Sequence, residues 1–377
     1  MYVYDIATKK STQITNDGKK NAIINGITDW VYEEEFAFVR AFDWSADSKK
    51  LAFIRFDESE VPEFSMSIFR KDLYPTVETF KYPKAGEKNS TVSLHIYDVA
   101  TASKKDVNLS NYSDFYIARM KWTKDANVLS AQVLNRHQDN LDLLFIDGNA
   151  ATAKVVLNEK DKAYVDVTDN LTFLKDNSFI WTSEKDGFNH IYLYDKTGKL
   201  KNQVTKGNWE ITNYYGFDEK SNTVFYQSVE NGSINRDVYR IGIDGKNKTR
   251  LTSQTGTNTA TFSPNYQYFI NAFSSATQPP VYSLNESKSG KSIQVIENNE
   301  ALATKLKAYD IATKEFFVLK TSKGHSLNAW MIKPKDFDAS KKYPVFMYQY
   351  SGPGSQQVNN DWNSADDFWF AMLAQQG

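Results

Sequence analysis

The residues of this 377-residue chain that could do chemistry lie at two places, and the first is an acidic run. Glu33, Glu34 and Glu35 directly follow the segment DWVY. Neighbouring carboxylates raise each other's pKa unless a cation lies between them. The run therefore fits either a solvated acidic loop or a site that binds an ammonium group. In an extended strand Glu34 and Glu35 would face opposite ways, so they can converge on one ligand only from a helical turn or a bend.

The second place is the segment KKYPVFMYQYSGPGSQ near the end of the chain. The apolar run 343–350 shows no alternation, which is typical of a strand buried on both faces of an α/β sheet. One interpretation is an ordinary core strand that ends in a Gly-Pro-Gly turn. The other uses Tyr350, whose hydroxyl would lie at the C-terminal edge of the strand, where α/β proteins place active sites. A phenol there could donate to an oxyanion.

Composition removes several other chemistries. The chain has no cysteine, so disulfides, thiolate metal sites and cysteine nucleophiles are excluded. It also contains no G-x-S-x-G sequence. No pair among the four histidines has metal-ligand spacing, and we expect surface or core roles for them; they are His95, His137, His190 and His325. The sequence therefore predicts neither a metal nor a cofactor.

The charge and the hydropathy limit the partners. Lys and Arg number 45 against 46 Asp and Glu, so there is no electrostatic argument for nucleic acid or an anionic membrane. No apolar run approaches the roughly 18 residues of a membrane span, and the first residues lack the basic and apolar regions of a leader peptide. Because the sequence starts in a strand-like pattern and stops after a helix-like one, we expect a fragment cut at both ends.

Two short patterns alternate from the start to about residue 290. One is a strand that ends in an Asp turn, at Asp5, Asp98, Asp147, Asp195 and Asp244. The other is an aromatic residue, a polar turn and an apolar strand, at Trp44, Trp122, Phe173, Phe217 and Phe262. Repeats of about 40–50 residues with about four short strands are typical of β-propeller blades. We predict roughly six blades or part-blades, with a two-sheet sandwich as the alternative.

One interval of the repeat is longer than the others. Asp5 and Asp98 are 93 residues apart, against 48 or 49 for the later intervals. The excess falls in two insertions, one containing GITDWVYEEEF and one covering roughly residues 58–87. Insertions in repeat proteins collect on one face as loops, often the binding face. The acidic run is therefore predicted to lie on such a loop.

The repeat ends near residue 293. IQVIENNEALATKLKAYDI predicts an edge strand and a short helix capped by Asn298 or Asn299. EFFVLKTSKGHSLNAWMIKP predicts a hairpin around Lys323 and Gly324. We therefore predict a propeller over residues 1–294 and the first strands of an α/β-hydrolase domain over 295–377, in a mainly β chain.

Four segments together resemble dipeptidyl peptidase IV and its bacterial relatives. They are GITDWVYEEE, WSADSKKLAFIRFDESEVPEF, YPKAGEKNSTV and KKYPVFMYQYSGPGSQ, and they occur in the order and approximate spacing of that family. The resemblance covers essentially the whole chain. It implies a propeller of about eight blades joined to an α/β-hydrolase domain. It also implies a serine peptidase that removes N-terminal dipeptides with penultimate proline or alanine.

The resemblance assigns roles to five residues. It implies that Glu34 and Glu35 bind the α-ammonium group of the substrate and that Tyr350 is the oxyanion-hole tyrosine. Phe36 and Phe38 would help to form the wall of the same pocket. The implied partners are peptides with a free N-terminus, with a homodimer in the full-length protein and a periplasmic or secreted location.

The chain also departs from the family pattern. The arginine that holds the glutamate pair would precede Met1, and the catalytic serine, aspartate and histidine would follow Gly377, so we expect the chain alone to be inactive. Two alternatives stay open. Another prolyl oligopeptidase relative would share the architecture but needs no free-amine anchor. A non-catalytic propeller used as a binding module would explain residues 1–290 but not the YPVFMYQYSGPG segment.

Overall fold

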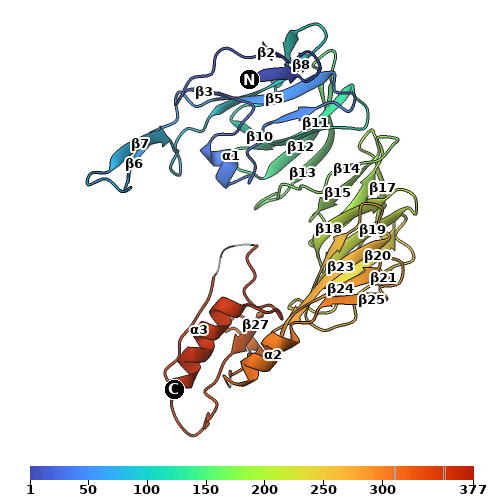
Figure 1. The fold of residues 1–377 in the computed structure, drawn as a ribbon. Coiled ribbons are helices and arrows are strands. Elements are labelled where there is room, and N and C mark those ends of the chain that lie inside the picture. Colours follow the sequence, from blue (N-terminus) through green and yellow to red (C-terminus); the bar gives the residue numbers. More distant parts are fainter. Residues whose placement is uncertain (310, 351, 353) are drawn as a thin grey trace. The chain divides into compact units, whose positions relative to one another are not determined.

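Antiparallel sheets of four strands make up most of the protein (Figure 1). The computed structural model describes residues 1–309, 311–350, 352 and 354–377. The chain divides into two compact units. The first comprises Met1–Trp181 and Tyr194–Lys201, and the second comprises Thr182–Leu193 and Asn202–Gly377.

Four of the sheets are simple meanders in which strands that follow one another in the chain are also neighbours. The first is formed by β10 (Phe115–Trp122), β11 (Val128–Asn135), β12 (Asn140–Asp147) and β13 (Ala153–Lys160). The next contains β14 (Thr172–Phe173), β15 (Phe179–Ser183), β16 (His190–Tyr194) and β17 (Leu200–Gln203). The third contains β18 (Ile211–Asp218), β19 (Thr223–Ser228), β20 (Asp237–Gly242) and β21 (Thr249–Arg250). The fourth contains β22 (Thr257–Phe262), β23 (Tyr268–Ser275), β24 (Gln278–Glu286) and β25 (Ser292–Glu297).

Two further sheets precede these four. Strands β1 (Tyr2–Asp5) and β2 (Lys10–Gln13) form a hairpin. A five-stranded sheet contains β3 (Ile23–Asn25), β4 (Phe42–Trp44), β5 (Lys50–Asp57), β8 (Thr91–Asp98) and β9 (Ser103–Asp106). Strands β3 and β4 pair with opposite ends of β5, so they act as one strand with an insertion between them. These sheets correspond to the roughly six blades or part-blades predicted from the repeat, and the propeller fold class is confirmed.

The repeated aspartates have one structural role. In each turn the Asp Oδ1 accepts a hydrogen bond from a backbone N–H two or three residues further on, as at Thr8, Thr101, Ala150, Thr197 and Lys246. Such a side chain fixes the turn by replacing a backbone acceptor. The same hydrogen bonds hold the pKa of Asp98 and Asp147 below its ordinary value.

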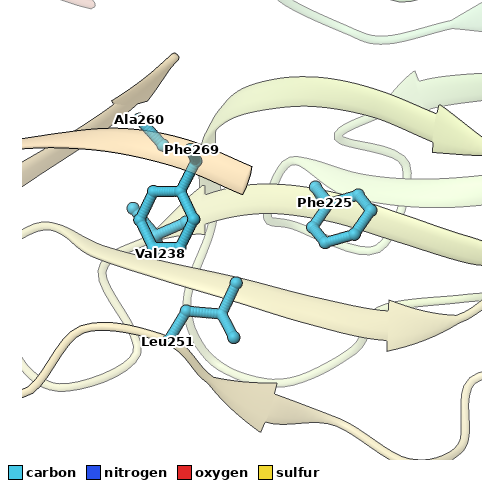
Figure 2. Close-up of a cluster of buried hydrophobic side chains, with 5 residues drawn as sticks. All are labelled: Phe225, Val238, Leu251, Ala260 and Phe269. Carbon is cyan, nitrogen blue, oxygen red and sulfur yellow. The ribbon is translucent and has the colours of Figure 1, made fainter. Parts of the chain in front are cut away.

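The repeated aromatic residues pack where neighbouring sheets meet. Trp122 is buried, and its indole N–H donates to the carbonyl of Asp43 in the preceding sheet at 3.0 Å. Figure 2 shows the corresponding core in the second unit, where Phe225, Val238 and Leu251 meet Ala260 and Phe269 of the following sheet. Each sheet thus buries a face that it could not bury alone.

Both predicted insertions are present in the first unit. The insertion between β3 and β4 contains α1 (Trp30–Glu34). The second insertion forms a separate hairpin of β6 (Glu63–Ile68) and β7 (Thr76–Lys81), which projects from the five-stranded sheet in Figure 1. Both insertions are therefore short structured elements.

The C-terminal part is only partly as predicted. Helix α2 (Glu300–Lys307) begins after Asn299, and the predicted hairpin is formed by β26 (Glu315–Lys320) and β27 (Ser326–Met331), with Gly324 at φ 83°. The cap differs in detail, because the Asn299 amide donates to the carbonyl of Pro280 and Asn298 Oδ1 accepts from the Glu300 N–H. Helix α3 (Ser364–Gln375) follows. No helix in the described residues has the length and apolar character needed to cross a bilayer.

The prediction of a buried strand over 343–350 is wrong for this structure. The segment forms no strand, and Val345 and Met347 are 87% and 79% exposed. A strand buried on both faces needs hydrogen-bonded neighbours, and among the described residues no strand pairs with this run. Of the predicted Gly-Pro-Gly turn, Pro353 lies outside the described residues. The domain boundary at 294/295 stays a prediction.

Candidate substrate-binding site

The acidic run lies on a loop that is closed at its base. Ile27 and Arg40 form an isolated antiparallel bridge where the loop leaves and rejoins the sheet. The Thr28 N–H donates to the Val39 carbonyl at 3.1 Å, and its hydroxyl donates to the carbonyl of Phe38 at 3.0 Å. The two ends of the insertion are therefore fixed to each other and to the five-stranded sheet.

Helix α1 begins at a buried cap. Asp29 has an extended backbone conformation, and its Oδ1 accepts from the Tyr32 N–H at 3.0 Å. Its Oδ2 accepts from the hydroxyl of Ser90 at 2.6 Å. A side-chain acceptor at this position satisfies one of the N–H groups that a helix leaves unpaired. The aspartate of the DWVYEEE segment is therefore a structural cap.

Tyr32 attaches α1 to the core. It is 2% exposed, and its ring contacts the rings of Phe36, Phe38, Phe56 and Tyr116. Its hydroxyl accepts from the backbone N–H of Ile117 at 2.9 Å. Burial raises the pKa of this hydroxyl well above its ordinary value. One side of α1 is thereby held against the neighbouring sheet.

Glu33, Glu34 and Glu35 occupy the opposite, exposed side of the turn. Glu34 is the last residue of α1, and Glu35 follows with helical backbone angles of φ −86° and ψ −37°. The helical turn that the two side chains would need in order to converge is therefore present. Within the described part of the chain, no cation forms an ion pair with any of the three carboxylates. The run is thus open to a cation from outside.

The two predicted wall residues lie in different surroundings. Phe36 is buried and contacts Tyr32 and Tyr116 at ring-centroid distances of 5.1 Å. Phe38 is half-buried, and the guanidinium of Arg119 lies 5.3 Å from its ring centroid. Arg119 also forms a two-pronged ion pair with Asp169. Phe38 therefore lies closer to an accessible surface than Phe36.

A cavity of about 340 Å³ is lined in part by Arg119, whose guanidinium also lies over the ring of Phe38, although Phe38 itself does not line the cavity. Other lining residues are Arg40, Phe42, Asp43 and Lys121. Glu34 and Glu35 do not line it. Sequence reasoning missed Arg119 and Asp169 because they are 50 residues apart and belong to no local pattern.

A second carboxylate is buried behind α1. Glu58 is buried near Asp29, and burial together with the charge of Asp29 raises its pKa, while Lys81 opposes this shift. Burial also raises the pKa of Asp29, against the hydrogen bonds from Ser90 and Tyr32. The support of the acidic turn therefore itself contains two buried carboxyl groups.

Tyr350 belongs to the second unit. It is 63% exposed, and no hydrogen-bond partner of its hydroxyl occurs among the described residues. A Cβ on Gly352 would lie 2.6 Å from its ring, so the ring lies close to the backbone of Gly352. Tyr348 differs: its hydroxyl donates to Gln357 at 3.4 Å, and its ring contacts Phe370.

Comparison with known proteins decides the family. Residues 1–280 match the family model described as the dipeptidyl peptidase IV (DPP IV) N-terminal region. The chain belongs to the dipeptidyl peptidase IV family. Its fold is also similar to the crystal structure of Porphyromonas gingivalis dipeptidyl peptidase 4, with a TM-score of 0.94 and 46% identity over 100% of this chain and 53% of that one.

Other dipeptidyl peptidase IV relatives agree. Dipeptidyl peptidase 4 of Trichophyton tonsurans is 31% identical over 97% of this chain and 49% of its own length. A putative dipeptidyl aminopeptidase IV from Bacteroides ovatus shares the fold, with a TM-score of 0.82, at 24% identity over 100% of this chain and 57% of that one. The chain thus spans about half the length of the curated relatives that it matches.

One arrangement in this dipeptidyl peptidase IV region looks like a catalytic triad but lies in the wrong place. His95 Nε2 is 2.8 Å from Ser93 Oγ, and His95 Nδ1 is 2.7 Å from Asp106 Oδ1. His95 is buried and stacked on Phe53 within the sheet of β5, β8 and β9. Because the His95–Asp106 hydrogen bond joins neighbouring strands β8 and β9, while Ser93 lies on the same strand as His95, we assign this group to the stability of the blade.

Proposed function

We propose that this chain is the substrate-selecting part of a serine-type dipeptidyl peptidase that releases N-terminal dipeptides with penultimate proline or alanine. The observation that carries the proposal is the unpaired, exposed Glu34–Glu35 pair on a turn whose other side is buried. A rigid turn with two carboxylates suits an ammonium group, because charge-assisted hydrogen bonds to it are strong.

The pair would set the length of the released product. If Glu34 and Glu35 hold the α-ammonium group, the substrate can extend only a fixed distance toward the nucleophile. Such an anchor admits two residues and excludes longer acyl segments. The anchor would thereby restrict an otherwise general hydrolase to cleavage near the N-terminus of its substrate, which makes it an exopeptidase.

Tyr350 would act in the chemical step. In a serine peptidase the hydroxyl attacks the carbonyl carbon after the second residue, and a histidine takes the proton. The phenol of Tyr350 would donate to the oxygen that becomes negative in the tetrahedral intermediate. Its exposure and the lack of a hydroxyl partner among the described residues support this role, since the donor is not engaged elsewhere.

The 377 residues are proposed to be inactive by themselves, because they contain no G-x-S-x-G sequence for the nucleophile. We expect no turnover of a glycyl-prolyl chromogenic amide above the buffer blank. Labelling of this chain by a fluorophosphonate, with loss of a measurable amidase activity, would contradict the proposal. A homodimer and a periplasmic or secreted location stay predictions from the family.

The amine anchor separates this proposal from its alternatives. A full-length dipeptidyl peptidase carrying this sequence should cleave a free glycyl-prolyl amide and refuse its N-acetylated form. Another prolyl oligopeptidase relative would cleave both peptides, and a non-catalytic binding module would cleave neither. Equal rates for the acetylated and the free peptide would therefore refute the amine anchor.

A further inference from the structure

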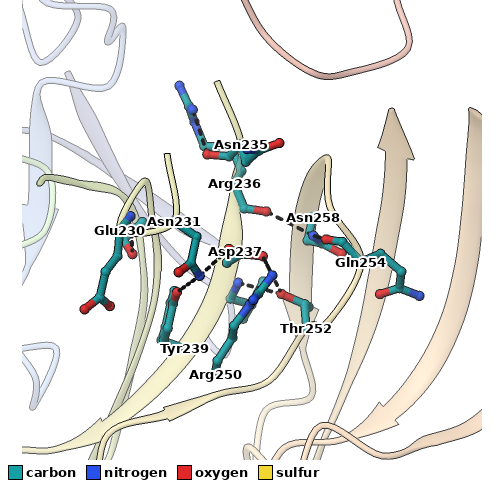
Figure 3. A network of polar contacts seen from close by, with 12 residues as sticks. Glu230, Asn231, Asn235, Arg236, Asp237, Tyr239, Arg250, Thr252, Gln254 and Asn258 are labelled. Carbon is teal, nitrogen blue, oxygen red and sulfur yellow. Dashed lines mark hydrogen bonds and ion pairs between the residues drawn. The ribbon is translucent and has the colours of Figure 1, made fainter. Parts of the chain in front are cut away.

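The connection between β19 and β20 forms a rigid platform in the second unit. Figure 3 shows the buried carboxylate of Asp237 accepting from Arg250 at 2.8 Å and from the Asn231 amide at 2.9 Å. The amide of Asn258, which is fully buried, donates to the Arg236 carbonyl at 3.0 Å. A buried polar network with satisfied partners rigidifies the backbone around it.

Asn360 uses all of its polar groups to bind this platform and the following sheet. Its backbone N–H donates to the Ile234 carbonyl at 2.8 Å, and its side-chain amide donates to Asn235 Oδ1 at 3.1 Å. Its carbonyl accepts from the Thr257 hydroxyl at 3.1 Å, and its Oδ1 accepts from the Ala276 N–H at 3.0 Å. One residue therefore joins the β19–β20 connection to the first residue of β22 and to the β23–β24 connection, in two adjacent sheets.

Two neighbours strengthen the same attachment. Gln356 Oε1 accepts from the guanidinium of Arg236 at 2.9 Å, and its amide donates to the Ser233 carbonyl at 2.7 Å. The Trp362 N–H donates to the Ser274 hydroxyl at 3.3 Å. The segment 356–362 thus lies along the ends of both sheets.

This segment begins a few residues after Tyr350. The ring of Tyr350 lies against Gly352, and the Gly352 carbonyl accepts from the Ser355 N–H at 3.3 Å. Gln356 is the next residue. The described contacts therefore lead from the tyrosine ring to the platform, although the hydroxyl itself has no partner among the described residues.

From these contacts we infer that Asn360 is a positioning residue for Tyr350. It fixes the segment 356–362 to the blades, and this segment in turn holds Tyr350 in place. The inference rests on the proposed function, because it assumes that Tyr350 donates to the oxyanion. An oxyanion donor must be held in place before the charge develops. A displacement of about 1 Å can cost on the order of a hundredfold in rate.

The kinetic test is a double-mutant cycle in a full-length dipeptidyl peptidase carrying this sequence. Asn360→Ala should lower kcat by roughly tenfold to a hundredfold with little change in KM. In a Tyr350→Phe background the same change should cost almost nothing, because the donor is already absent. Additive losses would overturn the positioning role while leaving the proposed function intact.

The matched control is Asn359→Ala. Among the described residues Asn359 donates only to the Gln356 carbonyl at 3.2 Å, within the segment itself and not to the blades, so Asn359→Ala should lower kcat by less than Asn360→Ala. Thr257→Val removes the hydrogen bond that the blade donates to the Asn360 carbonyl. It should also lower kcat, but by less than Asn360→Ala. This second variant keeps the test valid if Asn360→Ala does not fold.

A structural readout separates failure of the inference from failure of the proposed function. Amide hydrogen exchange of the 377-residue chain should become roughly tenfold faster over 356–362 in Asn360→Ala, and stay unchanged over β19 and β20. Unchanged exchange over 356–362 would overturn the inference. Faster exchange together with a Tyr350→Phe enzyme of normal kcat would support the attachment, remove the catalytic role of Tyr350 and refute the proposed mechanism.

Discussion

Ser90 and Asp29 are 61 residues apart in the chain, and the Ser90 hydroxyl donates to Asp29 Oδ2 at 2.6 Å behind helix α1. This hydrogen bond joins the residue that precedes β8 to the cap of the acidic turn. The position of Glu34 and Glu35 therefore depends on a residue outside their own insertion.

The first prediction concerns this hydrogen bond. Ser90→Ala should lower the free energy of unfolding by about 1–3 kcal/mol at neutral pH, because a buried carboxylate loses a donor. Burial already raises the pKa of Asp29, so losing the donor raises it further and the loss of stability grows as the pH rises. Urea denaturation at several pH values measures both effects. The control is Ser67→Ala on the exposed strand β6, and an equal effect of both changes would contradict the prediction.

The second prediction concerns the amine anchor. In a full-length enzyme, Glu34→Gln or Glu35→Gln should raise KM roughly 10- to 150-fold, which corresponds to about 1.5–3 kcal/mol for a hydrogen bond to a charged group. Stability should change little, because both side chains are exposed. Glu33→Gln in the same run is the control. The measurement is steady-state kinetics with a glycyl-prolyl amide. Equal KM values for all three variants would contradict the anchor.

The third prediction concerns the oxyanion donor. Tyr350→Phe should lower kcat by about 10²–10³ with little change in KM, because the donor matters mainly in the transition state. Tyr348→Phe should keep kcat near normal, since its hydroxyl is engaged with Gln357 and its ring contacts Phe370. If Tyr348→Phe lost activity and Tyr350→Phe did not, the oxyanion role would move to Tyr348.

The fourth prediction concerns the buried histidine. Burial lowers the pKa of His95, against the opposing effect of Asp106. The unfolded chain, with a histidine pKa of about 6.5, then binds a proton that the folded chain does not, so stability is present at higher pH and falls as the pH drops below about 6.5. The melting temperature of the unmodified chain should therefore fall as the pH is lowered from about 7.5 to 5, and His95→Gln should make this fall smaller. An unchanged slope in His95→Gln would refute the assignment of this group to the stability of the blade.

The sequence predicted features whose signals are local. The aspartates of the repeat were visible because each fixes its own turn, and aromatic residues such as Trp122 and Phe262 because they pack where two sheets meet. The insertion with the acidic run was predicted because it lengthened one repeat. Features of this kind can be predicted without knowing which strands pair with one another.

The features that sequence reasoning missed depend on distant partners. An apolar run such as 343–350 indicates burial only where strands lie beside it, and the described residues supply none. The Arg119–Asp169 ion pair and the Ser90–Asp29 hydrogen bond join residues 50 or more positions apart, so no spacing indicates them. The attachment of Asn360 to two connections and to the start of β22 is of the same kind.

The meander order within the blades has a consequence for unfolding. Each four-stranded sheet completes its own hydrogen-bond ladder from consecutive residues and needs its neighbours mainly for side-chain packing. Stability in such an array is close to a sum of the intrinsic stabilities of the repeats and the terms for adjacent interfaces. Partial melting of one sheet can therefore leave more distant sheets folded. Calorimetric and van't Hoff enthalpies of this chain should then differ, with the van't Hoff value the smaller of the two.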